Sequence, residues 1–295
     1  MTPQLERLRG PLSGDQVAAI SALAAAAEAV DGEAPLSESF LLSLVTDDSS
    51  HILSDGGSSG YAQVMDGGAC EFVVHPDHRG RGLGSALLAA AIDLGARSVW
   101  AHGSLPAARA FAQGHGLRVL RELHLMTRPL TESDAADPDL PSWVEVTTFA
   151  ARPDLAALTE LNAAAFASHP EQGALTMADI ASRMAQSWFD PAGLIFLLDR
   201  GDPHRGPIAF HWTKRAASAD AAHAEGEVYV VGVHPAYQGR GLSRALTLLG
   251  TAYLARNGVH LVHLYVDGDN AAALRTYTSL GFQIAHTDTQ LAIPQ

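Results

Sequence analysis

One plan occurs twice in this chain, and that repetition constrains the fold more than any other feature. The segment Phe72–Pro76 reads Phe-Val-Val-His-Pro and is followed by the glycine-rich run Arg79–Gly84. The second copy, Val231–Pro235, reads Val-Gly-Val-His-Pro and is followed by Gln238–Ser243. In each copy an apolar run ends at His-Pro, a glycine-rich turn follows, and a helical pattern begins. A duplication of this kind predicts two related domains in tandem.

The length of 295 residues also suits two domains. Residues 131–142 contain two prolines and four acidic side chains, which is typical of an exposed linker. We therefore expect an N-terminal domain at 1–130 and a C-terminal domain at 143–295. Alanine-rich helical sequence precedes the strands of each copy, and hairpin-like pairs precede each glycine turn. These patterns predict an α/β fold with a mixed, mostly antiparallel sheet flanked by helices.

Composition narrows the class of partner. The net charge of −13 disfavours nucleic acid and anionic membranes, and the 47% hydrophobic residues indicate a globular protein. The longest apolar stretch, Val17–Val30, is too short to cross a bilayer. Charged residues occupy Met1–Gly10, where an export signal needs an apolar core, and the single Cys70 cannot form an internal disulfide. We expect a cytoplasmic monomer that acts on small molecules.

The glycine-rich turn is a candidate anion site. A strand that stops at such a turn and passes into a helix presents several unpaired N–H groups toward one point. Glycines lack the Cβ atoms that would hold a phosphate away from the backbone. No lysine followed by Ser or Thr completes a P-loop, and the turns lie mid-domain, unlike a dinucleotide-binding turn. The residues that could add positive charge are Arg79, Arg81, Arg240 and Arg244.

The turns resemble the signature of the GNAT acyltransferases: Gln or Arg, two residues, Gly, one residue, then Gly or Ala. The first copy matches in full from Arg79 to Gly84. The second departs only at Ser243, which leaves its affinity for a pyrophosphate open. The resemblance implies two tandem GNAT domains that bind acetyl-CoA as co-substrate.

Transfer of an acetyl group to an amine needs a base, donors for the thioester oxyanion, and an acid for the departing thiolate. Backbone N–H groups around Val231–Val233 could hold the oxyanion. Glu227 lies eight residues before Pro235, at the start of the strand, and could take a proton from the amine directly or through water. Tyr277 lies four residues before Gly281 on the last helix and could protonate the thiolate.

The same offsets in the first copy give Gly68 and Ala112, neither of which can move a proton. Taken singly, Glu227 could be a solvated strand-edge residue and Tyr277 a core residue. Their joint presence in one copy and joint absence from the other favours catalysis. We predict that the C-terminal domain is catalytic and that the N-terminal domain binds acetyl-CoA without transferring its acetyl group.

Over nearly its whole length the sequence is similar to the actinobacterial mycothiol synthase family. The segments that carry the resemblance are Ala34-Pro-Leu-Ser-Glu38, His169-Pro-Glu-Gln-Gly173, Phe210-His-Trp-Thr-Lys214, Gly226-Glu-Val-Tyr-Val-Val-Gly-Val233, Leu264-Tyr-Val-Asp-Gly-Asp-Asn270 and Arg275-Thr-Tyr277. The family acetylates the cysteinyl amine of a cysteine-glucosamine-inositol conjugate, the last step of mycothiol synthesis. The resemblance implies that the residues holding this acceptor are Glu38, Glu171, Lys214, Glu227 and Tyr265.

The resemblance also implies the coenzyme contacts. Those of the N-terminal domain are Phe72, Val73, Val74, Gly80, Arg81, Gly82, Leu83, Gly84 and Ser85. Those of the C-terminal domain are Val231, Gly232, Val233, Gln238, Gly239, Arg240, Gly241, Leu242, Ser243, Arg244, Asn270, Ala271, Ala272, Ala273, Leu274 and Arg275. His234 departs from the family pattern, in which aspartate is usual before the proline.

Three alternative functions compete with this prediction. Metal catalysis is disfavoured because the 14 histidines are scattered, and His260 and His263, three apart in a predicted strand, would face opposite sides. A GNAT enzyme for another small amine, such as an aminoglycoside, would use the same chemistry in a different pocket. A non-catalytic acetyl-CoA sensor is suggested by the first copy, which keeps the turn without the proton carriers.

Overall fold

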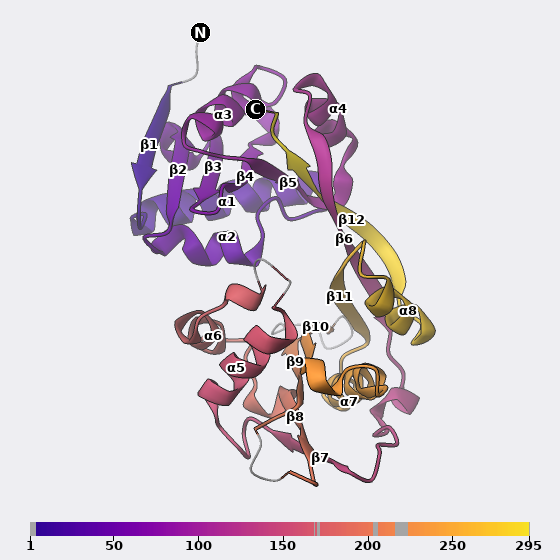
Figure 1. Ribbon diagram of the computed structural model, residues 1–295. Coiled ribbons are helices and arrows are strands. Elements are labelled where there is room, and N and C mark those ends of the chain that lie inside the picture. The colour runs from indigo at the N-terminus through magenta and orange to yellow at the C-terminus, as the bar shows by residue number, and fades with distance from the viewer. Residues whose placement is uncertain (1–3, 168, 170–171, 203–205, 216–223, 295) are drawn as a thin grey trace. The chain divides into compact units, whose positions relative to one another are not determined.

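The computed structural model describes residues 4–167, 169, 172–202, 206–215 and 224–294 (Figure 1). The chain forms two compact units. Unit 1 comprises Met1–His124, Asp267–Asp269 and His286–Gln295, and unit 2 comprises Leu125–Val266 and Asn270–Ala285. Within the described residues, no helix combines the length and the hydrophobicity needed to cross a membrane.

These units divide the chain differently from the expected boundaries of 1–130, 131–142 and 143–295. The last strand, β12 (Gln283–Ala292), pairs antiparallel with β5 (Ser98–Ala101) through Thr289–Ala292, so the end of the chain completes the sheet of unit 1. The expected linker belongs to unit 2, where Arg128 forms an ion pair with Asp134. A linker-like composition could not reveal that a distant strand returns to the first sheet.

The sheet of unit 1 has the strand order β1-β2-β3-β4-β5-β12. Its pairs are antiparallel except for β4 with β5, which is parallel. Its further strands are β1 (Leu5–Arg9), β2 (Ser49–Ser54), β3 (Gly60–Met65) and β4 (Ala69–Val74). Its helices are α1 (Gly14–Asp31), α2 (Glu38–Leu42), α3 (Leu83–Asp93) and α4 (Pro106–Gly114).

Strand alternation gives this sheet two buried faces. Ala62 of β3 packs in one apolar cluster with Leu87 of α3, and its neighbour Tyr61 packs in another with Leu23 of α1. Because successive side chains on a strand point to opposite faces, α3 and α1 cover opposite sides of the sheet (Figure 1).

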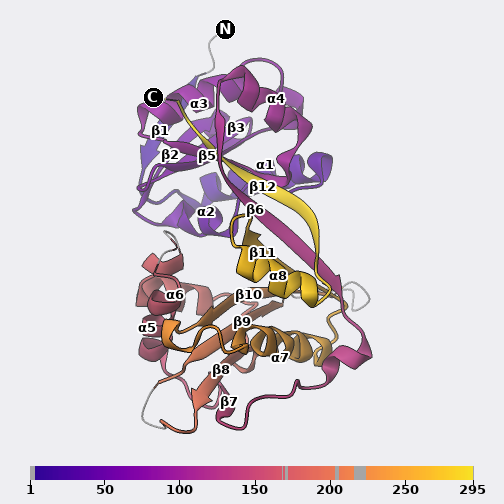
Figure 2. The same cartoon turned by 45° about the vertical axis from the view of Figure 1, so that its right-hand side comes forward.

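Unit 2 repeats this plan with the strand order β6-β11-β10-β9-β8-β7. Its strands are β6 (Arg118–Pro129, through its last residues), β7 (Val144–Thr148), β8 (Leu194–Asp199), β9 (Ala209–Arg215), β10 (Glu225–Val233) and β11 (Leu261–Asp267). Its helices are α5 (Leu155–Ala165), α6 (Met177–Met184), α7 (Leu242–Arg256) and α8 (Ala271–Ser279). On β9, Ala209 packs with Leu246 of α7 and Phe210 packs with Leu158 of α5. Helix α7 therefore covers one face, and α5 with α6 the other (Figure 2).

The parallel strand pair at the centre of each unit separates after a few residues. In unit 1, β4 and β5 pair only through Ala69 and Cys70. In unit 2, β10 and β11 pair only through Glu225–Glu227 and Leu261–His263. Beyond these points, the later residues of β4 no longer pair with β5, and those of β10 no longer pair with β11. Each glycine turn follows this opening, which positions the candidate site.

Candidate active site

Both glycine turns adopt the same left-handed backbone. The φ angles are +71° at Gly80 and +86° at Gly82, and +75° at Gly239 and +76° at Gly241. A Cβ atom at any of these positions would meet nothing within 4 Å, so the backbone conformation rather than internal crowding requires glycine. Gly82 and Gly241 are the N-caps of α3 and α7, and the turns therefore direct the first helical N–H groups toward open space.

The histidine of each His-Pro pair caps the short 3₁₀ turn that follows it. Nδ1 of His75 accepts from the N–H of Asp77 at 3.2 Å. Nδ1 of His234 accepts from the N–H of Ala236 at the same distance. An aspartate could accept this hydrogen bond in the same way, so the departure at His234 keeps the local structure.

The first residue of the GNAT-like signature links the turn to the end of the preceding strand through a side-chain hydrogen bond. Nε of Arg79 donates to the carbonyl oxygen of Val74 at 3.1 Å, and Nε2 of Gln238 donates to that of Val233 at 3.1 Å. The guanidinium of Arg79 also donates two hydrogen bonds to Asp31, at 2.7 and 2.6 Å. Asp31 thus neutralises Arg79, which corrects the expectation that this residue supplies free positive charge to a phosphate.

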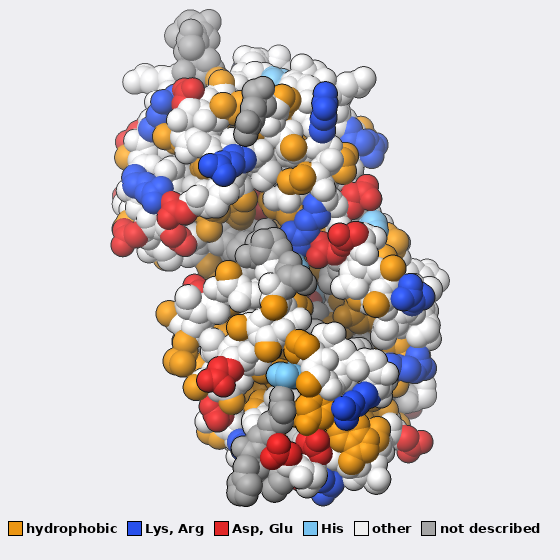
Figure 3. Space-filling model, viewed as in Figure 1, with side chains coloured by type: hydrophobic (Ala, Val, Ile, Leu, Met, Phe, Trp, Pro, Cys, Tyr) orange, Lys and Arg blue, Asp and Glu red, His pale blue; other side chains and the backbone are white. Residues whose placement is uncertain are grey.

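Two arginines beside the second turn are likewise held by the protein. Arg240 lies 4.8 Å above the ring of Tyr237 and donates to the carbonyl oxygen of Ala236. Arg244 donates to Oγ of Ser279 on α8 at 2.9 Å. On the molecular face drawn in Figure 3, Lys and Arg side chains are separated by acidic and neutral ones. The backbone N–H groups are therefore a feature of both turns that suits an anion, and the exposed Arg81 can add charge at the first turn.

A groove of about 820 Å³ occupies the strand opening of unit 1. Its lining combines the turn, the separated strands and helix α4, as shown by Phe72, Val74, Gly80, Gly82, Trp100 and Phe111. Seven of the nine expected coenzyme contacts of the first copy line this groove, and Arg81 and Leu83 do not. Its glycine cradle at one end and its apolar walls suit a ligand with a phosphate head and a long, weakly polar arm.

Two residues that line this groove, His102 and Glu33, belong to a chain of alternating acidic and imidazole side chains. His102 places Nε2 3.1 Å from Oε1 of Glu71 and Nδ1 3.1 Å from Oδ2 of Asp288. His286 continues the chain, with Nδ1 2.9 Å from Oε1 of Glu33 and Nε2 3.6 Å from Asp288. The second oxygen of Glu71 accepts from the N–H of Ser37 at 2.7 Å.

The protonation of His102 follows from these neighbours. Burial opposes a charge on the ring, but the hydrogen bond to Asp288 and the negative charges of Asp288 and Glu71 outweigh it and raise the pKa of His102 to about 10. The contact to Glu71 lacks hydrogen-bond geometry at Nε2, so we describe it as an ion pair. His102 therefore carries a proton at neutral pH. These carboxylates are separated from His102 by long stretches of sequence, which hid the cluster from sequence reasoning.

In unit 2, Glu227 lies at the point where β10 leaves β11. Its side chain is 12% exposed, and Oε2 lies 3.7 Å from Nζ of Lys214 and 3.6 Å from Nε2 of His263. The family resemblance implies Lys214 in the acceptor site, whereas from the sequence His263 is only a possible metal ligand. His260 is predicted to lie in the same strand as His263, but it lies just before β11. Within the described part of the chain, no group of three His, Cys, Asp or Glu is arranged to hold a metal ion.

A β-bulge in β10 changes which residues of the two copies correspond. The register with β9 shifts between Val228 and Val230, which leaves Tyr229 as an extra residue. Counted along the ladder from the His-Pro pair, the counterpart of Glu227 is therefore Ala69 rather than Gly68. Alanine cannot accept a proton either, so the contrast between the copies remains.

Tyr277 lies on α8 and packs on the α7 side of the unit 2 sheet. Its ring centroid is 5.8 Å from that of Phe282, within the cluster that contains Val228 and Leu254. Gly226 faces Leu254 on this same side, so Glu227, the next residue, faces the opposite side. The two side chains therefore lie on opposite faces of the unit 2 sheet. Burial raises the pKa of Tyr277 to about 12, so its hydroxyl stays protonated at neutral pH.

The remaining expected acceptor residues are distributed over both units. Tyr265 of β11 is 46% exposed, and its ring meets that of His263 edge-on. Asn270, which was expected among the coenzyme contacts, caps α8, with Oδ1 accepting from the N–H of Ala273. Glu38 is the first residue of α2 in unit 1, and Glu171 lies outside the described residues.

The repeated strand, turn and helix define an acetyltransferase of the GNAT class. A profile of the acetyltransferase (GNAT) family matches residues 155–282, and an acetyltransferase (GNAT) domain profile matches residues 43–118. The fold resembles a tandem GNAT protein of the clavulanic acid pathway (TM-score 0.70, 19% identity, 98% of each chain). It also resembles a GCN5-related N-acetyltransferase of Sphaerobacter thermophilus (TM-score 0.67, 24% identity, 97% of this chain and 94% of that one). The predicted pair of GNAT domains is confirmed.

Full-length relatives give the family. The chain is 45% identical to the mycothiol acetyltransferase of Nocardia farcinica, with 95% of each chain covered. It is 48% identical to that of Tsukamurella paurometabola, over 94% of this chain and 95% of the relative. The identity to that of Rhodococcus jostii is 40%, over 99% of each. The chain belongs to the mycothiol acetyltransferase family, as the sequence motifs predicted.

Proposed function

We propose that the protein transfers the acetyl group of acetyl-CoA to the cysteinyl amine of a cysteine-glucosamine-inositol conjugate, and that unit 2 performs the transfer. One observation carries the assignment of the unit. Glu227 stands where the parallel strands of unit 2 separate, flanked by Lys214 and His263, whereas its counterpart along the strand in unit 1 is Ala69, which has no carboxylate. A carboxylate beside the opening can accept the proton that an ammonium must lose before it attacks a thioester.

The other requirements of the reaction have candidates around the same opening. Backbone N–H groups of Val231–Val233 would stabilise negative charge on the thioester oxygen. As the carbon–nitrogen bond forms and the carbon–sulfur bond breaks, the coenzyme thiolate takes a proton from the Tyr277 hydroxyl. The raised pKa of Tyr277 keeps that hydroxyl protonated until it is needed. Glu227 and Tyr277 lie on opposite faces of the sheet, as suits a base for the acceptor and an acid for the coenzyme.

Unit 1 is proposed to bind acetyl-CoA without transferring its acetyl group. Its turn and its groove fit a nucleotide thioester, because the cradle is open and the walls are largely apolar. Ala69 and Ala112 replace the two proton carriers. Glu71 cannot substitute for them, since one of its oxygens accepts from Ser37 and the other faces a protonated His102.

Release of coenzyme thiol tests the reaction. The purified protein is incubated with acetyl-CoA and, separately, with the cysteinyl glycoconjugate, an aminoglycoside and an amino-acid amide. Fast release with the glycoconjugate supports the proposal, and mass spectrometry should show one added acetyl group on its amine. Release only with another amine would assign a different acceptor. Binding of acetyl-CoA without release from any amine would indicate a sensor.

A further inference from the structure

Aromatic side chains gather next to Glu227 on the α5/α6 side of the unit 2 sheet. The ring centroid of Tyr229 is 4.9 Å from that of Trp188 and 5.4 Å from that of Trp212. Nζ of Lys214 lies 5.1 Å from the Trp188 ring and 5.3 Å from the Tyr229 ring. Trp212 and Lys214 alternate along β9 and so share one face with Glu227. The aromatic group is therefore continuous with the proposed base.

Trp212 brings an unsatisfied donor to this group. The residue is 3% exposed, and its Nε1–H has no hydrogen-bond partner among the described residues. A buried N–H without a partner lowers stability, and such groups are uncommon in folded proteins. The indole N–H can only donate, so its natural partner is an acceptor oxygen.

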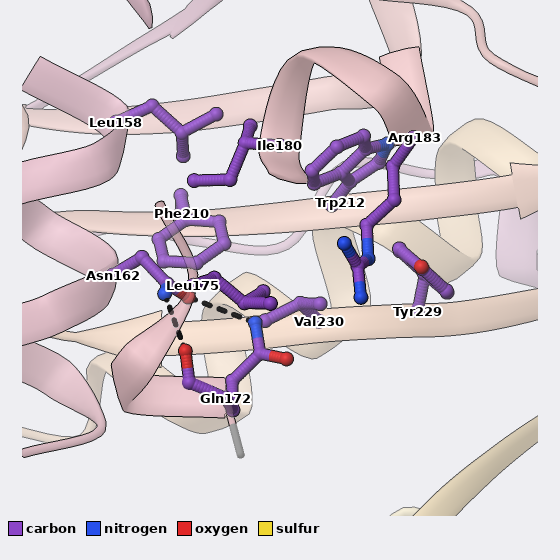
Figure 4. A pocket seen from close by; sticks show the side chains of 10 residues that line it. All are labelled: Leu158, Asn162, Gln172, Leu175, Ile180, Arg183, Phe210, Trp212, Tyr229 and Val230. Carbon is purple, nitrogen blue, oxygen red and sulfur yellow. Dashed lines mark hydrogen bonds between the residues drawn. The ribbon is translucent and has the colours of Figure 1, made fainter. Parts of the chain in front are cut away.

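Arg183 adds a cation without a carboxylate partner. Its NH1 group donates to the carbonyl oxygen of Asp179 at 3.0 Å, and no ion pair involves it in the part of the chain that the structure describes. Figure 4 shows its side chain running from α6 past Trp212 toward Tyr229. A guanidinium has five N–H donors, so most of those of Arg183 are available to a ligand.

These donors line a small pocket whose volume limits what can enter. The cavity is about 10 Å³, close to the space of one water molecule. Its floor is held by Asn162 and Gln172, which hydrogen-bond each other (Figure 4). A sugar or cyclitol ring cannot enter, but one hydroxyl group of such a ring can. The ring itself would then lie against the aromatic side chains outside, as polyols do on aromatic faces.

We propose that Trp212 Nε1 and the Arg183 guanidinium hold one hydroxyl of the polyol part of the acceptor, while the Trp188 and Tyr229 rings support its ring face. This inference rests on the proposed function and extends it. Glu227 takes a proton from the amine, and the pocket binds a hydroxyl group of the same molecule. The enzyme would thereby favour a polyhydroxylated amine over a cysteine derivative that presents the same amine alone.

The test compares two acceptors that share one amine. Specificity constants are measured for the cysteinyl glycoconjugate and for cysteinamide with the parent, Trp212→Phe and Arg183→Met. Phenylalanine keeps an aromatic ring without the donor, and methionine keeps a long side chain without the guanidinium. Each variant should lower kcat/KM for the glycoconjugate about 10-fold, as loss of one ligand hydrogen bond predicts. The values for cysteinamide and the KM for acetyl-CoA should stay unchanged.

Trp143→Phe is the matched control, because Trp143 packs against Tyr237 on the α7 side of the sheet and does not line the pocket. It should leave the ratio of the two specificity constants unchanged. If both variants, shown by circular dichroism to be folded, lower the two acceptors equally or not at all, the hydroxyl site is refuted and the pocket holds only water. If the parent enzyme does not acetylate the glycoconjugate, the proposed function itself is overturned.

Discussion

Oε2 of Glu227 and Nε2 of His263 lie 3.6 Å apart across the last residue pair of the parallel ladder between β10 and β11. Lys214 approaches the same oxygen at 3.7 Å from the antiparallel neighbour β9. The carboxylate is therefore fixed from both sides of its own strand, at the point where the sheet opens.

Replacing Glu227 should remove the base while leaving the coenzyme sites intact. We expect Glu227→Gln to lower kcat for acetyl transfer by about 10² to 10⁴-fold, the usual effect of losing a general base. Calorimetry should show unchanged affinity for acetyl-CoA. Glu225→Gln, an exposed carboxylate two residues earlier on the same strand, is the control and should keep full activity. Parent-like turnover by Glu227→Gln would exclude this residue as the base.

Removing the hydroxyl of Tyr277 should slow the departure of the thiolate. Tyr277→Phe keeps the packing against Phe282 and removes only the proton donor. We expect kcat to fall by about 10² to 10⁴-fold with little change in KM for the acceptor. Steady-state kinetics with both substrates varied would reveal this pattern. A rise in acceptor KM at constant kcat would assign Tyr277 to binding instead.

The acid–imidazole chain of unit 1 should make stability fall in mildly alkaline solution. The pKa of His102 is about 10 in the folded protein, compared with 6.5 in the absence of this environment. A pKa raised by folding stabilises the folded state fully below 6.5, and this contribution is lost as pH rises through about 10. Chemical unfolding between pH 6 and pH 10 should show this loss, and His102→Gln should flatten the curve over that window. A variant curve parallel to that of the parent would contradict the assignment.

Close packing in unit 2 should make Gly250 intolerant of a side chain. A Cβ atom added at this position of α7 would overlap the ring of His211, which is completely buried and donates from Nδ1 to the carbonyl oxygen of Leu246. We expect Gly250→Ala to lower the free energy of unfolding by about 1 to 3 kcal/mol or more. Gly14→Ala is the control. Its Cβ would meet nothing within 4 Å, so thermal denaturation should show an equal or higher midpoint.

The local features of the fold could be predicted from sequence because they depend on neighbouring residues. The repeat located both glycine turns, and the positive φ angles of Gly82 and Gly241 explain why glycine recurs there. The offset from the His-Pro pair predicts Glu227, and the family resemblance implies Lys214. Their proximity depends on the register between two adjacent antiparallel strands, which the bulge at Tyr229 sets.

Features that depend on distant pairing could not be predicted. Asp288 meets His102 only because β12 returns to β5, and no local pattern encodes that pairing. Counting residues along the sequence assumes that each residue pairs with one residue of the neighbouring strand. Tyr229 is an extra residue in a bulge, so the comparison of the two copies by sequence offset is wrong by one residue. His263 was missed for a similar reason: its partner lies on another strand of a parallel pair.

The pairing of β12 with β5 has a consequence for how the protein is made. During synthesis, β5 emerges long before β12, with nearly all of unit 2 translated between them. Until then the edge of β5 has no partner on that side, and exposed strand edges invite pairing with other chains. The sheet of unit 1 is therefore completed only when the last strand has been synthesised. A ribosome that stalls late in translation would leave this sheet without its final strand.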